Sequence, residues 1–342
     1  MDYRSLGESG LKVSPICLGT MMFGDRTDPN EAARIVSSAR TAGVNFIDTA
    51  NVYARGDSER VVGEFIRPHR AHWVLATKVA NIMGDGPNDR GLSKAHMVRA
   101  LDASLDRLHT DYIDLYYLHK DDTSTPLEET LRAMDGFIRA GKVRYWALSN
   151  YRAWRIAEVM RLCDALGMPR PIALQPYYNA MNRMPEVEVL PACAYYGMGV
   201  VPYSPLARGV LTGKYKAGAK PPEDSRAGRG DKRIAQTEFR EESMKYAEKM
   251  AAHAKKKGVT PGQFATAWVL ASDIVTSVLA GPRTLEQWEE YLGALNVKWA
   301  PEDEALVDGL VAPGHPSTPG YSDPMYPFFG RTRSGNPVRS PR

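Results

Sequence analysis

The stretch Trp73-Val-Leu-Ala-Thr-Lys-Val79 is a short apolar run rich in β-branched residues, and it predicts a buried strand. Longer amphipathic segments separate this run from seven others of the same kind. The eight predicted strands are 15–19, 45–49, 73–79, 112–119, 143–149, 172–175, 200–204 and 277–281. Such alternation is typical of βα units around a parallel sheet, and eight units favour a closed (β/α)₈ barrel of the TIM type, an α/β fold.

Start and stop signals predict helices between these strands. Asp28, Ser93, Pro126 and Pro185 each precede a run with apolar residues at helical spacing. Further helices are predicted over 237–257, 261–271 and 285–295. The segment 214–233 is rich in Gly, Pro, Lys and Arg, which indicates a long surface loop.

The two ends of the chain differ from its middle. Residues 1–14 predict a β-hairpin that plugs one end of the barrel, because two short strand-like runs flank Gly7-Glu-Ser-Gly10. Residues 15–310 are assigned to the barrel, and 311–342 form a tail rich in Pro and Gly. We therefore expect one domain over 1–342. A Rossmann sheet is disfavoured because Gly19-Thr-Met-Met-Phe-Gly24 lacks the GxGxxG spacing.

The composition is that of an ordinary globular protein, with 43% hydrophobic and 25% charged residues. Lys and Arg number 44 against 40 Asp and Glu, but the acid-free segment 324–342 holds four of the arginines. The remainder is balanced, which argues against a surface that binds nucleic acid or anionic lipid. The four are Arg331, Arg333, Arg339 and Arg342.

Cysteine usage and the N-terminus bear on the compartment. Cys17, Cys163 and Cys193 have neither metal-ligand spacing nor an even count for disulfides, so no metal site is predicted and a cytoplasmic setting is favoured. The N-terminus lacks the apolar segment of a signal peptide, and no apolar run approaches the length of a membrane span. Secretion and membrane insertion are both disfavoured.

Polar residues fall at the predicted C-terminal ends of the strands, where barrel enzymes carry their chemistry. A lysine at position 78 inside a buried apolar run needs a charge partner. Asp48 can supply the carboxylate, and Tyr53 a hydroxyl whose pKa a nearby ammonium is expected to lower, making it a general acid. The full set at these ends is Asp48, Tyr53, Lys78, His119, Ser149, Asn150, Gln175, Tyr203 and Ser204.

Other barrel chemistries fit these residues less well. A glycosidase needs two facing carboxyl groups at strand ends, and apart from Asp48 the nearby acids lie beyond the fourth strand in a loop. A metallohydrolase needs several converging ligands, whereas only His119 among seven histidines falls at a strand end. Ser149 and Ser204 have no neighbouring base in the sequence.

These residues lie in stretches that resemble the aldo-keto reductases, in the family's order from the hairpin to about residue 297. Within the family the chain is similar to the bacterial long-loop branch, whose relatives include the β subunits of voltage-gated potassium channels. The matching stretches are Leu18-Gly-Thr-Met-Met-Phe-Gly24, Phe46-Ile-Asp-Thr-Ala-Asn-Val-Tyr53, Gly56-Asp-Ser-Glu59 with Gly63-Glu64, Ala76-Thr-Lys78, Asp111-Tyr-Ile-Asp-Leu-Tyr-Tyr-Leu-His119, Gly141-Lys-Val-Arg-Tyr-Trp-Ala-Leu-Ser-Asn150, Gln175, Tyr203-Ser-Pro-Leu-Ala-Arg-Gly-Val-Leu-Thr-Gly-Lys-Tyr215 and Gly281-Pro-Arg-Thr-Leu-Glu-Gln-Trp-Glu-Glu-Tyr291.

The resemblance implies a catalytic tetrad of Asp48, Tyr53, Lys78 and His119 that reduces an aldehyde or ketone with NADPH. It implies NADPH over NADH because Arg283 suits a phosphate, which a guanidinium binds bidentately. Tyr291 stands where the family usually has asparagine, so adenine stacking is expected there. The implied cofactor residues are Gly19, Thr20, Met21, Asp48, Ser149, Asn150, Gln175, Tyr203, Ser204, Pro205, Leu206, Gly209, Lys214, Arg226, Gly281, Arg283, Gln287, Glu290 and Tyr291.

The partner implied is a small carbonyl compound, partly hydrophobic or bulky, because the expected pocket is apolar and aromatic. A second hypothesis is a redox sensor that binds the cofactor and turns over only incidentally. The sequence leaves the direction of the reaction and homo-oligomer formation open. The predicted substrate pocket consists of Met22, Phe23, Tyr53, Asn81 and His119, with the tail around 321–329 as a further wall.

Overall fold

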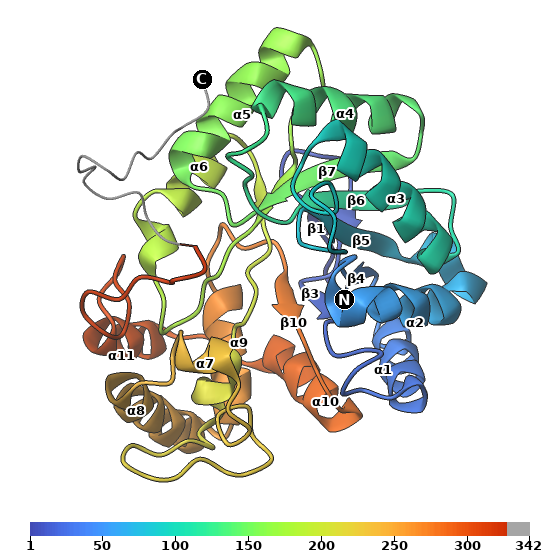
Figure 1. Cartoon of the computed structure of the whole chain (residues 1–342). Helices are drawn as coiled ribbons and strands as arrows, with labels where there is room; N and C mark the ends of the chain where they lie inside the picture. Colours follow the sequence, from blue (N-terminus) through green and yellow to red (C-terminus); the bar gives the residue numbers. More distant parts are fainter. Residues whose placement is uncertain (327–342) are drawn as a thin grey trace.

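The computed structural model describes residues 1–326, which form a barrel of eight parallel strands surrounded by helices (Figure 1). The strands pair in the order β10-β3-β4-β5-β6-β7-β8-β9. The ends of this sheet meet, because the Leu279 N–H donates to the Pro202 carbonyl oxygen at 3.0 Å and Tyr203 pairs in parallel with Leu279. The predicted (β/α)₈ fold is confirmed. The strands are β3 (Ile16–Gly19), β4 (Phe46–Asp48), β5 (Val74–Val79), β6 (Ile113–Leu118), β7 (Val143–Ser149), β8 (Ala173–Gln175), β9 (Gly199–Val200) and β10 (Val278–Ala280).

The N-terminal hairpin closes one end of the barrel. Its strands β1 (Arg4–Ser5) and β2 (Lys12–Val13) pair antiparallel. Leu6 and Val13 are fully buried and belong to the same apolar cluster as the inward-facing residues of the strands. This packing removes apolar surface from water at the end of the barrel opposite the polar strand termini.

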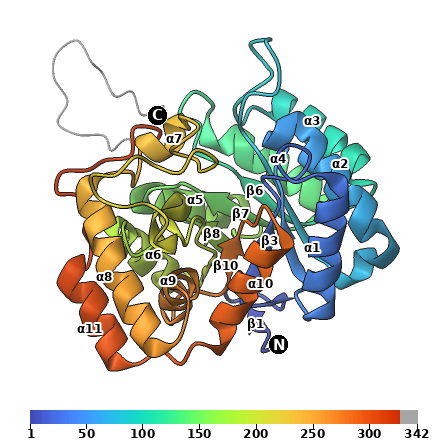
Figure 2. The same cartoon turned by 90° about the horizontal axis from the view of Figure 1, so that it is seen from below.

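Helices surround the strands, as Figure 2 shows from below. Two of the predicted starts carry the expected caps: Asp28 accepts hydrogen bonds from the N–H groups of Asn30 and Glu31, and Ser93 accepts one from His96. The α-helices are α1 (Pro29–Thr41), α2 (Asp57–Ile66), α3 (Lys94–Leu108), α4 (Leu127–Arg139), α5 (Ala153–Leu166), α6 (Val189–Tyr195), α7 (Lys232–Ala235), α8 (Glu241–Lys257), α9 (Pro261–Leu270), α10 (Leu285–Gly293) and α11 (Pro301–Leu310). Short 3₁₀ helices are η1 (Tyr53–Gly56), η2 (Arg67–His72), η3 (Met184–Glu186), η4 (Ala207–Thr212) and η5 (Ala294–Asn296).

Some predicted boundaries are wrong, and proline explains two of them. The predicted strand 200–204 keeps regular pairing only at Gly199–Val200, since Pro202 has no N–H to donate to a neighbouring strand. The single helix predicted to begin at Pro185 divides into η3 and α6. Pro191 lies in the first turn of α6, where its missing N–H needs no partner within the helix.

The helix α11 was not predicted, although its first turn carries a readable signal. Pro301 opens this turn, and Glu302, Asp303 and Glu304 place negative charge at the helix N-terminus. Among residues 1–326, no helix combines the length and the apolar character that crossing a membrane requires.

Candidate active site

A buried ion pair lies at the C-terminal ends of two neighbouring strands. Asp48 is the last residue of β4 and Lys78 lies on β5; their side chains are 1% and 0% exposed. The Lys78 ammonium donates to the Asp48 carboxylate and, at 2.7 Å, to the Thr49 carbonyl oxygen. Burial alone would lower the pKa of Lys78, but the carboxylate of Asp48 and the hydroxyl of Tyr53 raise it, so the lysine carries its charge. The predicted pairing is present.

The third donor position of Lys78 faces Tyr53. The ammonium lies 3.3 Å from the hydroxyl of Tyr53, and this tyrosine is the first residue of the 3₁₀ helix η1. The expected lowering of this tyrosine's pKa is wrong: burial raises the pKa of Tyr53, and the attraction of Lys78 offsets this only in part. Tyr53 is therefore a protonated phenol at neutral pH, poised to give up a proton beside a fixed positive charge.

His119 follows β6 and lies beside Tyr53, with ring centroids 5.9 Å apart in an edge-to-face arrangement. Burial and the nearby charges of Lys78 and Lys120 hold the pKa of His119 well below its usual range, so the imidazole is neutral. The Asn81 amide nitrogen lies 3.0 Å from His119 Nδ1. An amide nitrogen only donates, so Nδ1 accepts and the ring proton sits on Nε2.

Polar side chains from β7 and β8 form the adjoining wall. Gln175 donates to the second oxygen of Asp48 at 3.0 Å, and the Ser149 hydroxyl donates to the Gln175 carbonyl at 2.9 Å. Asn150 receives a hydrogen bond of 2.8 Å from the Tyr203 hydroxyl. The Tyr203 ring stacks on Tyr177 at 5.2 Å. This network fixes the amides and hydroxyls before any ligand is present.

Two residues of this wall hold unusual backbone angles. Asn150 has φ of 60° and Ser204 has φ of 58°, in the left-handed region that side chains other than glycine rarely adopt. Each residue directly follows the end of a barrel strand or its extension, where the chain turns away from the barrel axis. Such local strain is typical of sites whose geometry is held by the surrounding structure.

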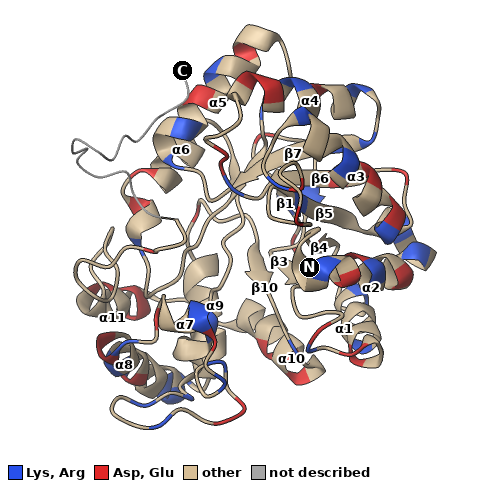
Figure 3. Ribbon diagram, in the orientation of Figure 1, with Lys and Arg blue, Asp and Glu red and all other residues tan. Residues whose placement is uncertain are grey.

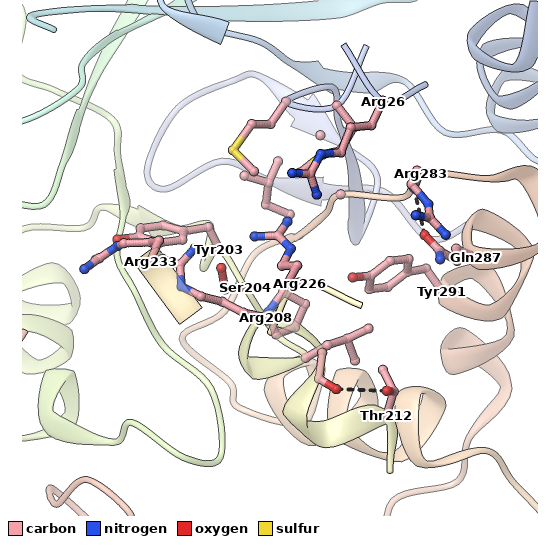
Figure 4. A pocket seen from close by; sticks show the side chains of 18 of the residues that line it. Arg26, Tyr203, Ser204, Arg208, Thr212, Arg226, Arg233, Arg283, Gln287 and Tyr291 are labelled. Atoms are coloured by element: carbon pink, nitrogen blue, oxygen red, sulfur yellow. Dashed lines mark hydrogen bonds between the residues drawn. The ribbon is translucent and has the colours of Figure 1, made fainter. Parts of the chain in front are cut away.

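These groups open into one cavity of about 710 Å³. Tyr53, His119 and Asp48 line one part of it, and every residue that the family resemblance implied for the cofactor lines it as well. Figure 4 shows Tyr203 and Arg233 toward one end of the cavity and Arg283, Gln287 and Tyr291 toward the other. The residues implied for catalysis and for the cofactor are thus neighbours along one continuous space.

The family comparison fits this arrangement. Residues 15–312 match the sequence profile of the Aldo/keto reductase family.

The chain belongs to the aldo/keto reductase family.

A probable voltage-gated potassium channel subunit beta of Arabidopsis thaliana is 40% identical over 302 residues, which cover 87% of this chain and 92% of that protein. A protein of the same description from Oryza sativa subsp. japonica is 39% identical over the same shares. The uncharacterized oxidoreductase YrpG of Bacillus subtilis is 37% identical over 309 residues, again 87% and 92% of the two chains. Membership in this family supports an oxidoreductase activity and, in general terms, carbonyl reduction with a nicotinamide cofactor.

The structure of this family member corrects two predicted pocket residues. Phe23 is fully buried in the core that packs the helices on the barrel, and it does not line the cavity, whereas its neighbour Met22 does. Asn81 is also absent from the lining; its amide instead contacts the back of His119. A turn explains the first error: the Phe23 N–H donates to the Thr20 carbonyl oxygen at 2.9 Å, and the side chain after this turn enters the core instead of the cavity.

The tail contributes two of the residues predicted around 321–329. Met325 and Tyr326 line the cavity, and the rest of that range, 327–329, lies outside the described residues. Arg152 donates to the Tyr326 carbonyl oxygen at 2.7 Å, and Arg233 forms a bidentate ion pair with Asp323. Residues 321–326 therefore form a strap across the cavity beside the catalytic groups, and we use that name for them below.

Most of the positive charge in the cavity was not predicted from the sequence. Arg26, Arg208, Arg229 and Arg233 line it in addition to the predicted Lys214, Arg226 and Arg283. Arg26 and Arg229 lie in loops, whereas Arg208 belongs to the 3₁₀ helix η4 and Arg233 to the short helix α7. Figure 3 shows α7 as a positively charged element. The Lys- and Arg-rich composition of 214–233 was the available signal for Arg229 and Arg233, whereas Arg26 and Arg208 lie outside that segment.

Proposed function

We propose that this protein is an NADPH-dependent reductase that converts an aldehyde or ketone to the alcohol, with Tyr53 as the general acid. The observation that carries the proposal is the contact of the Lys78 ammonium with the Tyr53 hydroxyl at the wall of a cavity. The far end of this cavity is lined by Lys and Arg side chains that form no ion pair within residues 1–326. A proton donor and a binding site for a phosphate-bearing cofactor then share one space.

The donor set of the cavity fits a dinucleotide with three phosphates. Within residues 1–326, Arg208, Arg226, Arg229, Arg283 and Lys214 form no ion pair with a carboxylate. Burial and the neighbouring Arg226 and Arg283 lower the pKa of Lys214, the mark of cations gathered without counter-charge. The buried Arg208 Nε also has no hydrogen-bond partner in this part of the chain. Phosphate oxygens would satisfy these donors.

Bound in this cavity, NADPH would supply the hydride for the reduction. Tyr53 gives its hydroxyl proton to the carbonyl oxygen as negative charge develops there. The phenolate that remains is stabilised by Lys78, whose charge is held in turn by Asp48. His119, neutral and with its proton on Nε2, donates a hydrogen bond that orients the carbonyl group.

The substrate end of the cavity favours a partly apolar carbonyl compound. Met22, Met325 and Tyr326 line the cavity together with Tyr53 and His119. These side chains offer apolar surface and few polar partners beyond the catalytic groups themselves. We expect aromatic aldehydes and bulky ketones to be reduced more efficiently than small charged carbonyl compounds.

The second candidate function is redox sensing by the bound cofactor. It is favoured by the 40% identity to a probable voltage-gated potassium channel subunit beta. The two functions differ in turnover: a sensor holds the cofactor and reduces the carbonyl compounds slowly, whereas a reductase turns them over at rates that depend on Tyr53.

The test follows the absorbance of NADPH and NADH with a panel of aromatic aldehydes, dicarbonyls and bulky ketones. Tyr53→Phe should lower turnover by about 10²–10⁴-fold, because it removes the general acid, and should leave cofactor binding nearly unchanged. Tyr117→Phe is the matched control: this tyrosine is buried inside the barrel, its ring is 5.8 Å from Lys78, and it does not line the cavity.

Three outcomes are informative. Loss of turnover in Tyr53→Phe but not in Tyr117→Phe supports the proposal. Full activity in Tyr53→Phe contradicts the role of Tyr53. Stoichiometric cofactor binding with no turnover of any compound by the wild type favours the sensor.

A further inference from the structure

The backbone that follows Tyr53 turns with left-handed angles. Ala54 has φ of 47° and Arg55 has φ of 56°, and Gly56, with φ of 101°, completes the turn before α2 begins. Two consecutive residues with a Cβ atom rarely adopt such angles, because the Cβ approaches the neighbouring carbonyl oxygen. A turn of this kind persists only where the surrounding structure holds it.

Ser58, in the first turn of α2, anchors this turn to the barrel. Its side chain is fully buried, and its hydroxyl donates to the Thr20 carbonyl oxygen at 2.8 Å. The same hydroxyl lies 3.0 Å from the hydroxyl of Thr20 and 2.9 Å from that of Thr49. Thr20 directly follows β3 and Thr49 directly follows β4. One hydroxyl therefore ties the start of α2 to the ends of two barrel strands.

Glu59 fixes the same turn from the other side. Its buried carboxylate accepts from the Thr77 hydroxyl on β5 at 2.5 Å and from Arg107 Nε on α3 at 2.7 Å. The Arg107 side chain packs closely against Gly56, where a Cβ atom would lie 2.9 Å from Arg107 Cδ. The turn after Tyr53 is thus held by three strands and a helix.

Tyr53 itself has little to hold it. Among residues 1–326, the hydroxyl of Tyr53 makes one hydrogen bond, the contact of 3.3 Å with the Lys78 ammonium. This contact is long, and both hydrogen bonding and Coulomb attraction weaken as the two groups separate. The position of the hydroxyl therefore depends on how firmly the backbone of the turn is fixed.

The buried face of α2 changes character along the helix. Its later residues Val62, Gly63 and Ile66 are apolar, whereas Ser58 places a hydroxyl among the hydroxyls that follow β3 and β4. Burying a hydroxyl is favourable only when it is hydrogen-bonded, and hydrogen bonds are directional where apolar contacts are not. The polar cluster thus fixes the position of the turn more narrowly than apolar packing would.

We propose that Ser58 is a positioning residue: its hydroxyl fixes the turn that carries Tyr53, and so sets the distance between the Tyr53 hydroxyl and the Lys78 ammonium. Ser58 does not line the cavity, so it acts through Tyr53 and not on a ligand. The inference rests on the proposed function of Tyr53 as the general acid.

The first test is steady-state kinetics of Ser58→Ala. The variant should lower kcat about 10–100-fold, because a small displacement of a reacting group is costly, and should change NADPH binding less than about twofold. Thr49→Val removes one partner of the cluster and should give a smaller loss. Ser14→Ala is the matched control: Ser14 is also fully buried, and its hydroxyl donates to the Ile16 carbonyl oxygen at 2.7 Å at the opposite end of the barrel.

A double-mutant cycle separates positioning from general stability. In the Tyr53→Phe background, Ser58→Ala should change the residual turnover less than about twofold, because the group that Ser58 positions is already gone. A merely structural role would lower turnover by the same factor in both backgrounds, which would overturn the proposal. Thermal unfolding verifies that each variant is folded.

A titration tests the same role without any substrate. The phenolate absorbance of Tyr53 is obtained as the difference between each protein and its Tyr53→Phe counterpart. Ser58→Ala should titrate at a higher pH than the wild type, since the phenolate loses part of the attraction of Lys78. An unchanged titration, or an unchanged kcat in Ser58→Ala while Tyr53→Phe is inactive, overturns the positioning role. A shifted titration in a protein that reduces no carbonyl compound would leave this role standing while the proposed reductase activity fails.

Discussion

The two ends of the cavity satisfy their charges in opposite ways. At the catalytic end, Lys78 is fully buried, on a strand, and paired with Asp48 within the chain. At the end that we propose for the adenosine, Arg26, Arg229 and Arg283 extend from loops and, among residues 1–326, have no buried counter-charge. The groups of the catalytic end are therefore in place before a ligand binds, whereas we propose that a ligand supplies the counter-charge at the other end. Changes at the first should affect folding and chemistry together, and changes at the second should affect binding alone.

The strongest test of this contrast is Lys78→Met. Removing one partner of a buried ion pair leaves the Asp48 carboxylate without compensation, which costs about 3–5 kcal/mol of the free energy of unfolding. We also expect turnover to fall by at least as much as in Tyr53→Phe, because Tyr53 loses the ammonium that stabilises its phenolate. Chemical unfolding and steady-state kinetics measure the two effects separately.

The double variant Asp48→Asn with Lys78→Met serves as the control. It removes both charges, so most of the lost stability should return while turnover stays low. If Lys78→Met alone is as stable as the wild type, the pair does not hold the catalytic end together and the contrast between the two ends is wrong.

The same contrast separates what the sequence could and could not predict. Lys78, Asp48 and His119 could be predicted because the apolar runs show where each strand ends, and because a lysine in a buried apolar run needs a charge partner. Arg26 and Arg229 were missed because loop conformation depends on contacts distant in sequence, such as that of Thr27 with Arg283. No periodicity relates these positions.

Two predictions at the catalytic end, the lowered pKa of Tyr53 and the place of Asn81, were wrong because they depend on tertiary structure. The attraction of Lys78 on Tyr53 was foreseen from the sequence, but the opposing desolvation depends on how deeply the hydroxyl is enclosed, which only the fold reveals. The contact between Asn81 and His119 similarly requires the loop after β5 to turn back toward β6. The sequence thus identified the chemical groups, and the tertiary structure decided their protonation states.

A pH dependence of stability should be detectable at the catalytic end. His119 has a pKa well below its usual range in the folded protein, so the unfolded chain binds a proton near pH 6.5 that the folded protein does not. The resulting stability is fully present above that pH and is lost as the pH falls, by at most about 1.4 kcal/mol per pH unit. His119→Gln removes this titration.

The measurement compares the free energy of unfolding of wild type and His119→Gln between pH 7.5 and 5. The wild type should lose stability relative to the variant as the solution is acidified. A difference that stays constant across this range would show that His119 is protonated as easily in the fold as in the unfolded chain, and would remove the neutral hydrogen-bond donor from the mechanism.

The smallest effect is expected at the strap beside the catalytic groups. Arg233 lines the cavity and holds Asp323 through two hydrogen bonds, and the strap then presents Met325 and Tyr326 to the substrate space. Asp323→Asn should weaken this bidentate pair and raise the substrate KM about three- to tenfold with little change in kcat, because the strap touches the substrate and not the reacting groups.

Glu128→Gln breaks an exposed surface pair of α4 and is the control, since such pairs contribute little. An unchanged KM in Asp323→Asn would mean that Arg152 and the other contacts of the strap are enough to hold it in place. A fall in kcat equal to the rise in KM would instead place the strap within the catalytic end, because only groups that position the reacting atoms alter the chemical step.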